Sequence, residues 1–456
     1  MTAKFTLDEL QQAYAAGQID TVIACQVDMQ GRLMGKRFHA DYFIKQAVKE
    51  THACNYLLAT DMDMHTVDGY AATSWQAGYG DYVMKPDLTT LRPLPWLAGT
   101  ALVLCDVLDH ATHEPVAHSP RAMLKKQIAR LADLGMQPMM ATELEFFLFN
   151  QSYAEVHEAG YQHLKLASAY NQDYHILQTS KEESVLRAIR NGLFGAGIPV
   201  ECSKGEASAG QEEINIQYAD ALTTADYHSI VKTACKEIAW SQGKAVTFMA
   251  KWDYSAAGSS AHIHQSLWSL DGQTALFFDP QAPDGMSTLM RHYLAGLLAH
   301  ADALTYFLAP WINSYKRFQA GTFAPTKAIW SRDNRTAGYR LCGEHSQALR
   351  IECRVGGADL NPYLALAAQI AAGLDGIERQ LELEPEFRGD AYAANHVRTI
   401  PTTLRAALEK LDHSAMLRAA MGDAVIEHYL HTGQWEQFEY DRRVTNWELW
   451  RGFERA

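Results

Sequence analysis

Two carboxylates stand close together in an apolar stretch of the sequence. Glu143 and Glu145 are separated by one residue within residues 139–149, a run whose length and apolar character are typical of a β-strand. Side chains two positions apart on a strand point to the same face, so both carboxylates project together. Ionised carboxylates repel each other, and burial raises their pKa unless a cation holds them. The pair therefore indicates either a cation site or a solvated strand face.

Three further segments repeat this grouping of charged and polar side chains. The groups are His262, His264 and Ser266, then Arg350, Glu352 and Arg354, and finally Glu206 and Glu213 on either side of a glycine turn. A single segment of this kind would decide nothing. Several of them inside an apolar chain predict a cavity lined by strands rather than unrelated surfaces.

The chemistry follows from the types of ligand. Carboxylate oxygens with one or two imidazoles are the ligands of a hard cation such as Mg²⁺ or Mn²⁺, and no cysteine is placed to favour zinc. Mg²⁺ commonly bridges protein carboxylates to nucleotide phosphates. Arginines are concentrated between Arg317 and Arg354, and guanidinium groups bind phosphate and carboxylate bidentately. These residues together favour phosphoryl transfer.

The elements that must position these groups alternate along the chain. A hairpin is predicted from strands at 21–27 and 32–38, followed by a strand at 101–107. We place a domain boundary near residue 110, which gives domains 1–110 and 111–456. In the second domain the predicted strands are 139–149, 213–218, 246–251, 261–267 and 349–355, and the predicted helices are 119–134, 182–194, 223–242, 289–308 and one that opens at Asn361-Pro362. This order indicates an α/β or α+β second domain, without a dinucleotide-binding or P-loop glycine motif, and we class the whole chain as α+β.

Composition restricts the classes of function. The chain has 456 residues, a formal charge of −13 and a pI near 5.8. An acidic protein lacks the basic surface that binds nucleic-acid phosphates, so we expect no nucleic-acid partner. The N-terminus lacks the apolar core of a signal peptide, and no apolar run approaches the roughly 20 residues that span a bilayer, so we expect no membrane association. Seven cysteines without a CxxC pair favour reduced thiols and a cytoplasmic protein.

Ordered motifs across nearly the whole chain resemble those of the glutamine synthetase family. They are Glu143-Leu144-Glu145-Phe146, Gly210-Gln211-Glu212-Glu213-Ile214, Gly258-Ser259-Ser260-Ala261-His262-Ile263-His264, Asn313-Ser314-Tyr315-Lys316-Arg317-Phe318, Asp333-Asn334-Arg335-Thr336, and Arg350-Ile351-Glu352-Cys353-Arg354 followed by Asn361-Pro362-Tyr363-Leu364. The resemblance implies a small N-terminal β-grasp domain and a larger catalytic domain whose strands form a funnel at a subunit interface. It also implies hexameric rings, stacked in pairs as a homododecamer.

The resemblance assigns roles to individual residues. It implies one metal ion on Glu145, Glu206 and Glu213, and a second on Glu143, His262 and Glu352. It implies that glutamate is bound by Gly258, His262, Arg317 and Arg354, and ATP by His264, Ser266, Arg335, Arg340 and Arg350. Two to three Mg²⁺ or Mn²⁺ ions per active site are expected.

The implied reaction has two steps. The γ-carboxylate of glutamate attacks the γ-phosphate of ATP, while the cations and arginines such as Arg317 and Arg335 neutralise the developing charge. An amine then attacks the γ-glutamyl phosphate, which releases phosphate and leaves an amide. The implied enzyme is a glutamate–amine ligase that forms ADP.

The amine site departs from the ammonia-using enzymes of the family at two positions. Those enzymes carry an acid on a flap with the pattern Gly-x-Glu-x-Pro, whereas this chain reads Gly321-Thr322-Phe323-Ala324-Pro325. Ala257 also replaces an asparagine that normally precedes the glycine of the histidine segment. Phe323 cannot bind or deprotonate ammonium, but it can pack against an organic substituent and contribute about 25 cal/mol per Å² of apolar surface buried. The two changes predict an organic amine as the substrate.

Other parts of the amine pocket match the family. Tyr174 aligns with a pocket tyrosine, and Asp61 aligns with an aspartate that a neighbouring subunit donates and that would act as the base, with Asp63 as a competitor. The flap and its surroundings resemble the γ-glutamylpolyamine and γ-glutamyl-monoamide synthetases of amine catabolism. A monoamine such as an alkylamine or aniline is favoured, because no second acidic contact for a diamine is found in the sequence; a polyamine is the alternative.

Two other functions stay open at this point. One is an ordinary glutamine synthetase that uses ammonia. The other is a non-catalytic structural relative, which predicts that metal ligands have been lost, whereas all of the ligands named above are present.

Overall fold

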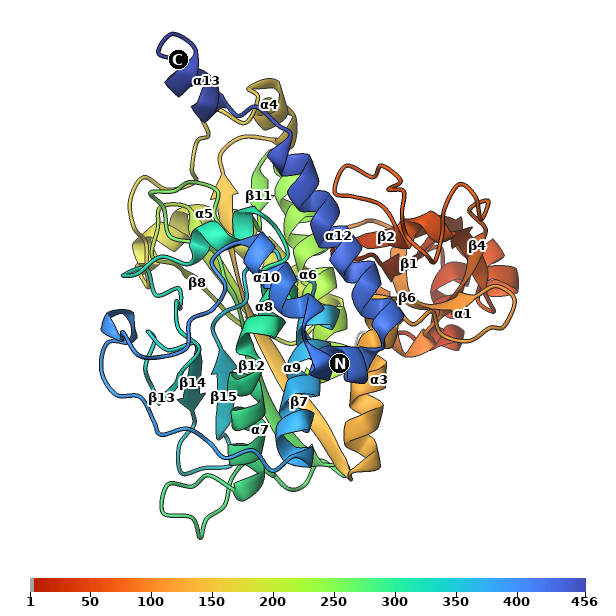
Figure 1. The fold of residues 1–456 in the computed structure, drawn as a ribbon. Helices are drawn as coiled ribbons and strands as arrows, with labels where there is room; N and C mark the ends of the chain where they lie inside the picture. The colour runs from red at the N-terminus through yellow and green to blue at the C-terminus, as the bar shows by residue number, and fades with distance from the viewer. Residues whose placement is uncertain (1–3) are drawn as a thin grey trace.

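The computed structural model describes residues 4–456 and contains two β-sheets with helices packed around them (Figure 1). Residues 1–3, with which the predicted domain 1–110 begins, lie outside the described residues. The six-stranded sheet draws its strands from residues 21–109, and the nine-stranded sheet from residues 136–353. The boundary near residue 110 stays a prediction that falls between the two sheets.

The six-stranded sheet is built around a hairpin. The predicted hairpin is confirmed as β1 (Thr21–Val27) paired antiparallel to β2 (Leu33–His39). Asp28 closes its turn by accepting hydrogen bonds from the backbone N–H groups of Gln30 and Arg32, and Gly31 has a φ of 82° that favours glycine. The other strands are β3 (Thr51–Cys54), β4 (Asp81–Pro86), β5 (Arg92–Pro93) and β6 (Thr100–Asp109), the last of which lies parallel to β1. Two N-terminal helices, α1 (Leu7–Ala15) and the short α2 (Ala40–Tyr42), complete this part.

Strand β7 (Met136–Phe149) is the centre of the nine-stranded sheet. The strand order is β13, β14, β15, β12, β7, β9, β8, with β10 and β11 also paired to β7. The bounds are β8 (Val200–Gly205), β9 (Gln211–Ile216), β10 (Ala219–Asp220), β11 (Ala245–Thr247), β12 (Ala261–Ser269), β13 (Trp330–Arg332), β14 (Tyr339–Cys342) and β15 (Arg350–Cys353). Because β7 pairs with both β12 and β9, side chains from three distant segments meet on its face.

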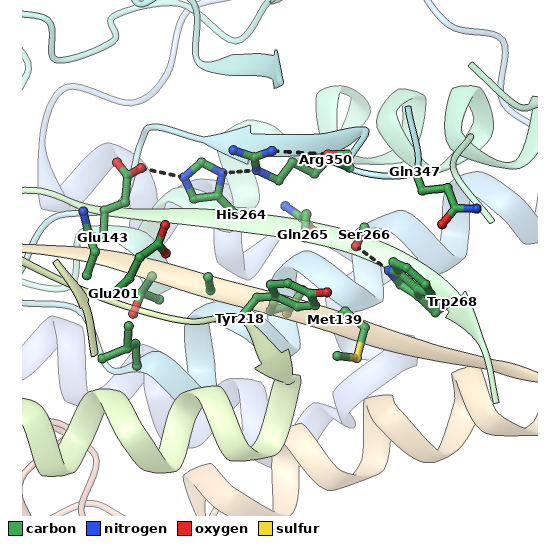
Figure 2. A pocket seen from close by; sticks show the side chains of 16 residues that line it. Met139, Glu143, Glu201, Tyr218, His264, Gln265, Ser266, Trp268, Gln347 and Arg350 are labelled. Carbon is green, nitrogen blue, oxygen red and sulfur yellow. Dashed lines mark hydrogen bonds and ion pairs between the residues drawn. The ribbon is translucent and has the colours of Figure 1, made fainter. Parts of the chain in front are cut away.

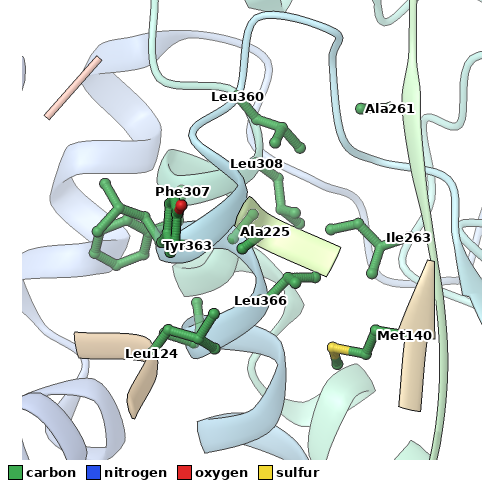
Figure 3. Close-up of a cluster of buried hydrophobic side chains, with 14 of the residues drawn as sticks. Leu124, Met140, Ala225, Ala261, Ile263, Phe307, Leu308, Leu360, Tyr363 and Leu366 are labelled. Carbon is green, nitrogen blue, oxygen red and sulfur yellow. The ribbon is translucent and has the colours of Figure 1, made fainter. Parts of the chain in front are cut away.

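Helices cover the other face of this sheet and form the main core. They are α3 (Pro120–Asp133), α5 (Ile176–Gly195), α6 (Ala221–Ser241), α7 (Thr288–Ala299), α8 (Ala301–Leu308) and α9 (Pro362–Glu378), whereas the short α4 (Tyr153–Glu158) packs in a separate small cluster through Val156. Asn361 starts α9 as predicted, since its side chain accepts a hydrogen bond from the backbone N–H of Tyr363. Helix α9 is apolar on nearly all sides, which is typical of a helix inside a core. Figure 3 shows buried side chains around it, among them Leu124, Ala225, Ile263 and Phe307.

Three predicted elements differ from the structure. Helix α5 begins at Ile176 rather than at residue 182. The prediction missed its first turn because Ile176 and Leu177 are exposed, so the apolar residues there do not follow the periodicity of a buried helix face. The predicted helix 289–308 is broken at His300, since α7 packs on α9 whereas α8 packs mainly on α10. The predicted strand 246–251 stops at Thr247, because the backbone at Lys251 turns to hydrogen-bond with the Asn313 side chain.

The C-terminal helices return to the N-terminal sheet. They are α10 (Leu404–Asp412), α11 (Ala415–Met421), α12 (Asp423–Asp441) and α13 (Asn446–Gly452). On α12, the Thr432 hydroxyl lies 2.8 Å from the Tyr70 hydroxyl, and the ring of His428 stacks on that of His118 with centroids 4.2 Å apart. These contacts hold α12 against the loop between β3 and β4, which contains Tyr70, and against the segment between the two sheets, which contains His118.

Helix α13 projects away from the body of the molecule at the top of Figure 1. Its large apolar side chains Trp447, Trp450 and Phe453 are exposed. Within residues 4–456 no helix is both long and apolar enough to cross a membrane, and the seven cysteines are all unpaired.

Candidate active site

Strand register brings the predicted metal ligands together. The cross-strand pairs are Glu143 with His262 (β7 and β12), Glu145 with Glu213 (β7 and β9), and Glu352 with His264 (β15 and β12). The antiparallel ladder determines which residues face each other, so a slip of one residue would turn every one of these side chains to the opposite face. The site therefore depends on the pairing of four strands.

Glu145, Glu206 and Glu213 form a compact acidic group. One carboxylate oxygen from each lies within 4.8 Å of the others. Glu145 is oriented by Ser260, whose backbone N–H and hydroxyl each donate a hydrogen bond of 2.7 Å. Burial, followed by the charge of Glu206, raises the pKa of Glu145 to about 7, and burial with the charge of Glu145 raises the pKa of Glu213 to about 9. A divalent cation would relieve this repulsion, and the oxygen donors fit the predicted metal ion.

The second predicted metal group is held together by hydrogen bonds. Glu143 Oε2 lies 3.0 Å from His262 Nδ1, and Glu143 Oε1 lies 2.9 Å from His264 Nε2. The ligand atoms within 4.8 Å of one another are those of Glu143, His264 and Glu352. Burial opposes ionisation of Glu143, but the hydrogen bonds from both histidines hold its pKa well below its usual range. His264, predicted only as a neighbour of the nucleotide, thus lies in this group as a hydrogen-bond partner of Glu143, beside the predicted ligand His262.

The ionisation of His262 and Glu352 suits metal binding. Burial and then the nearby Arg354 guanidinium lower the pKa of His262 to about 4, so its imidazole is neutral at neutral pH and can offer a lone pair. Burial opposes ionisation of Glu352, but Arg354 and then His262 lower its pKa to about 2. The group therefore combines two carboxylates with a neutral imidazole.

The predicted glutamate-binding residues lie beside these carboxylates. Arg317 is buried and donates to the backbone carbonyls of Val355 and Arg354, both at 3.0 Å. Arg354 donates to Glu352, while its buried Nε has no hydrogen-bond partner among residues 4–456. At Gly258 an added Cβ would lie 2.6 Å from Arg317 Cγ, so only glycine allows this approach. The arginines are thus packed in place beside the carboxylates.

Three of the predicted ATP-binding residues, His264, Ser266 and Arg350, line one cavity of about 530 Å³, here called the Ser266 cavity (Figure 2). Arg350 Nε donates to His264 Nδ1 at 3.1 Å, so His264 must carry its proton on Nε2 and donate it to Glu143. Met139, Tyr218 and Trp268 add apolar and aromatic surface to the same cavity. Such a mixture suits a flat ring with an attached polar group.

A second cavity, of about 390 Å³, contains most of the other predicted residues and is here called the carboxylate cavity. Its lining includes Glu143, Glu145, Glu206, Glu213, Gly258, His262, Arg317, Arg335, Arg340, Glu352 and Arg354. Arg340 pairs with Glu352 at 2.9 Å and also with Asp333. Glu143 and Asn215 line both cavities, so they lie where the two cavities border each other.

Two predicted amine-pocket residues line the carboxylate cavity. Phe323 and Tyr174 are 58% and 69% exposed, and Ala257 lies in the same wall. Both aromatic residues have left-handed backbones, with φ of 58° and 55°. This conformation destabilises a residue other than glycine by about 1–3 kcal/mol. The rest of the fold must therefore stabilise the backbone that places these two rings at the cavity.

Asp61 lies elsewhere in the chain's own structure. Its carboxylate accepts hydrogen bonds from the backbone N–H groups of Asp63 and His65 and from the indole of Trp435 at 3.3 Å. The described lining of the carboxylate cavity does not include it. Its predicted place in the active site of a neighbouring subunit stays a prediction.

The carboxylate cavity also contains two residues that sequence reasoning missed. Lys204 lies at the end of β8 and contacts Glu206 and Asp173. The only sequence signal was the position of Lys204 two residues before Glu206. Asp173 lies in a loop, and nothing in the sequence placed it near the site.

Comparison with known proteins identifies the class. Residues 117–451 match the family model described as "Glutamine synthetase, catalytic domain". The chain belongs to the glutamine synthetase family. It is 47% identical to the γ-glutamylethanolamide synthetase of Streptomyces coelicolor over 455 residues, which cover 100% of this chain and 97% of that protein. It is 37% identical to the glutamate–isopropylamine ligase of a Pseudomonas species over 434 residues, 94% of each chain.

Structural comparison gives the same result. The solved structure of GmaS without ligand superposes with a TM-score of 0.85 at 27% identity and covers 98% of this chain and 100% of that one. The predicted family, its γ-glutamylamide branch, its fold and the class of glutamate–amine ligase are thereby confirmed. Enzymes of this family use ATP and divalent metal ions; the individual site residues stay predictions.

Proposed function

We propose that the protein uses ATP to join the γ-carboxylate of glutamate to an organic monoamine through γ-glutamyl phosphate. The proposal rests mainly on the position of Phe323. This residue places an aromatic ring in the wall of the carboxylate cavity, at the position where the ammonia-using enzymes have an acid. Ala257 in the same wall removes a further polar group. An apolar wall favours the carbon body of an amine over hydrated ammonium.

The first step would take place where the two cavities border each other, beside Glu143. Two or three Mg²⁺ or Mn²⁺ ions on the carboxylates would supply positive charge to the phosphates of ATP. Arg335 and Arg340 would neutralise the phosphoryl group as it is transferred, and Arg317 and Arg354 would hold glutamate. The contact of Arg317 with buried backbone carbonyls supports this role, because it fixes the guanidinium before substrate binds.

The second step needs a base and a complete amine pocket. We infer that Asp61 of a neighbouring subunit supplies the base and that the subunits assemble as a homododecamer of two hexameric rings. Support comes from the exposed Trp447, Trp450 and Phe453 of α13, which monomeric proteins rarely leave uncovered as a group. The seven unpaired cysteines support a cytoplasmic location, where the product would enter amine catabolism.

A panel of amines tests the proposal. Purified protein is given glutamate, ATP and Mg²⁺ with ammonium, ethylamine, isopropylamine, ethanolamine, aniline or putrescine, and phosphate release is measured. We expect kcat/KM for a monoamine to exceed that for ammonium by at least about 100-fold, which corresponds to the burial of a few methylene groups. Ammonium as the best substrate would instead identify an ordinary glutamine synthetase, and no turnover with any amine would identify a non-catalytic relative.

A further inference from the structure

Lys204 places a positive charge inside the carboxylate cavity. It projects from the end of β8 with its side chain 19% exposed. Its Nζ contacts the carboxylate of Glu206, lies 3.4 Å from Asp173 Oδ1 and 3.3 Å from the backbone carbonyl of Gly205, and sits 4.3 Å from the ring centroid of Tyr174. The ammonium is therefore held by two carboxylates and one aromatic face.

Asp173 is the one carboxylate of this cavity, among residues 4–456, that is not a predicted metal ligand. Its side chain is 42% exposed, so a solute in the cavity can reach it. It lies next to Tyr174 in the chain, on the side where the amine pocket is expected. If Lys204 were absent, the carboxylate of Asp173 could form an ion pair with the second ammonium group of a diamine.

The charge of Lys204 changes what the pocket can accept. A cation near Asp173 satisfies that carboxylate and repels any further cation that enters. The same charge disfavours the protonated form of a bound amine and so favours the neutral, nucleophilic form. An amine with one nitrogen tolerates this environment, whereas a diamine must bring a second charge close to Lys204.

On this basis, and resting on the function proposed above, we propose that Lys204 is a specificity-determining residue that masks Asp173 and makes the amine pocket reject diamines. It acts by repulsion, in addition to the apolar contact that Phe323 offers. Specificity commonly combines an attractive contact for one ligand with an unfavourable contact for its competitor.

A purely structural role for Lys204 makes a different prediction. If the lysine only holds Glu206 in place for a metal ion, its loss should weaken the response to Mg²⁺ equally for every amine. If it sets specificity, its loss should change the ratio between two amines measured at saturating Mg²⁺. The ratio separates the two roles because both amines share the same metal, ATP and glutamate sites.

Butylamine and putrescine are the matched probes, since they share a four-carbon chain and differ by one terminal ammonium group. For wild type we expect kcat/KM for butylamine to exceed that for putrescine, and for Lys204→Met and Lys204→Gln we expect this preference to fall by about tenfold, the effect of losing one close charge repulsion. Lys204→Arg keeps the charge and should stay within about threefold of wild type. Adding Asp173→Asn to Lys204→Met should remove the gained activity toward putrescine.

The outcomes are distinct. An unchanged preference in the two neutral variants, or a loss of activity with every amine at saturating Mg²⁺, would overturn the role in specificity. Circular dichroism checks folding; if neither neutral variant folds, Asp173→Asn alone carries the test and should strengthen the preference for butylamine by about threefold, with no change as the contrary result. The proposed function is judged separately, by whether wild type uses organic amines in preference to ammonium.

Discussion

Glu145 and Glu213 face each other across neighbouring strands, β7 and β9, and point into one cavity with Glu206. No cation of the chain pairs directly with either carboxylate among the ion pairs of residues 4–456. Burial of two acids in this arrangement costs stability unless a metal ion or protons compensate. Several measurable properties follow from this pair and from the other contacts described above.

Glu145→Gln should lower phosphate release with glutamate and the best amine by at least about 100-fold, because an amide cannot balance the charge of a metal ion. The activity should be measured as a function of Mg²⁺ concentration. Glu183→Gln is the matched control, since Glu183 pairs with Arg190 at the surface and such pairs contribute about 0–1 kcal/mol. Equal activity of the two variants would show that Glu145 is not a metal ligand.

Metal affinity should rise with pH. The pKa values of about 7 for Glu145 and about 9 for Glu213 lie above the usual value near 4.5, so protons compete with the metal ion at neutral pH. Isothermal titration of Mg²⁺ or Mn²⁺ in buffers of different ionisation enthalpy should show proton release and tighter binding from pH 6 to about 9. Binding independent of pH in this window would contradict the assignment.

The same pair predicts how the metal-free protein responds to pH. A carboxyl group whose folded pKa is raised stabilises the folded state fully below its unfolded pKa and loses this contribution as the pH rises through the folded value. Thermal unfolding of the metal-free protein should therefore occur at lower temperature as the pH rises through about 7 and then about 9. Saturating Mg²⁺ should reverse the trend.

The stacked His118 and His428 predict an opposite response in acid. Burial lowers the pKa of His118 to about 4 from its usual 6.5, and it also lowers the pKa of His428. A base with a lowered pKa stabilises the folded state fully above 6.5, and the contribution is lost as the pH falls from 6.5 to about 4. His118→Phe keeps an aromatic ring against His428 and should reduce the acid sensitivity of the melting temperature. An identical pH profile would assign the effect to other groups.

Phe323→Glu should raise kcat/KM for ammonium by about tenfold or more and lower it for isopropylamine, because it restores an acid and removes apolar surface. Phe323→Leu is the control, since it keeps the apolar wall without adding charge. Both variants share any strain at this left-handed position, where φ is 58°. A drop in ammonium use by Phe323→Glu would show that the flap does not choose the amine.

Removal of residues 446–456 should reduce the mass of the assembly measured by light scattering. This segment carries Trp447, Trp450 and Phe453, whose exposed side chains would become buried in a contact between subunits. The control is the variant Trp75→Ser, which removes an exposed aromatic side chain that is distant in sequence from residues 446–456. An unchanged mass after truncation would assign the assembly to other surfaces.

The candidate metal ligands could be recognised from the sequence because their pattern is local. Glu143 and Glu145 share a strand face, and the spacing of His262 and His264 repeats that pattern. The resemblance then placed them in one site, and the register of β7 and β12 brings Glu143 opposite His262.

Other features depended on contacts that no local pattern reveals. The break at His300 follows from two halves of one apolar stretch packing on different helices. The meeting of Lys204 and Asp173 depends on the path of the loop before α5. Asp61 lies outside the carboxylate cavity of its own chain, because its carboxylate is tied to the backbone of residues 63 and 65 and to Trp435.

Glu143 borders the Ser266 cavity on one side and the carboxylate cavity on the other, and His264 connects it to Arg350. If a ligand alters the surroundings of this carboxylate from one side, the binding free energy on the other side changes with it. Thermodynamic linkage then requires reciprocity: whatever factor the nucleotide contributes to the affinity for glutamate, glutamate must contribute to the affinity for the nucleotide. The coupling free energy between the two cavities can therefore be obtained from two binding isotherms without any turnover.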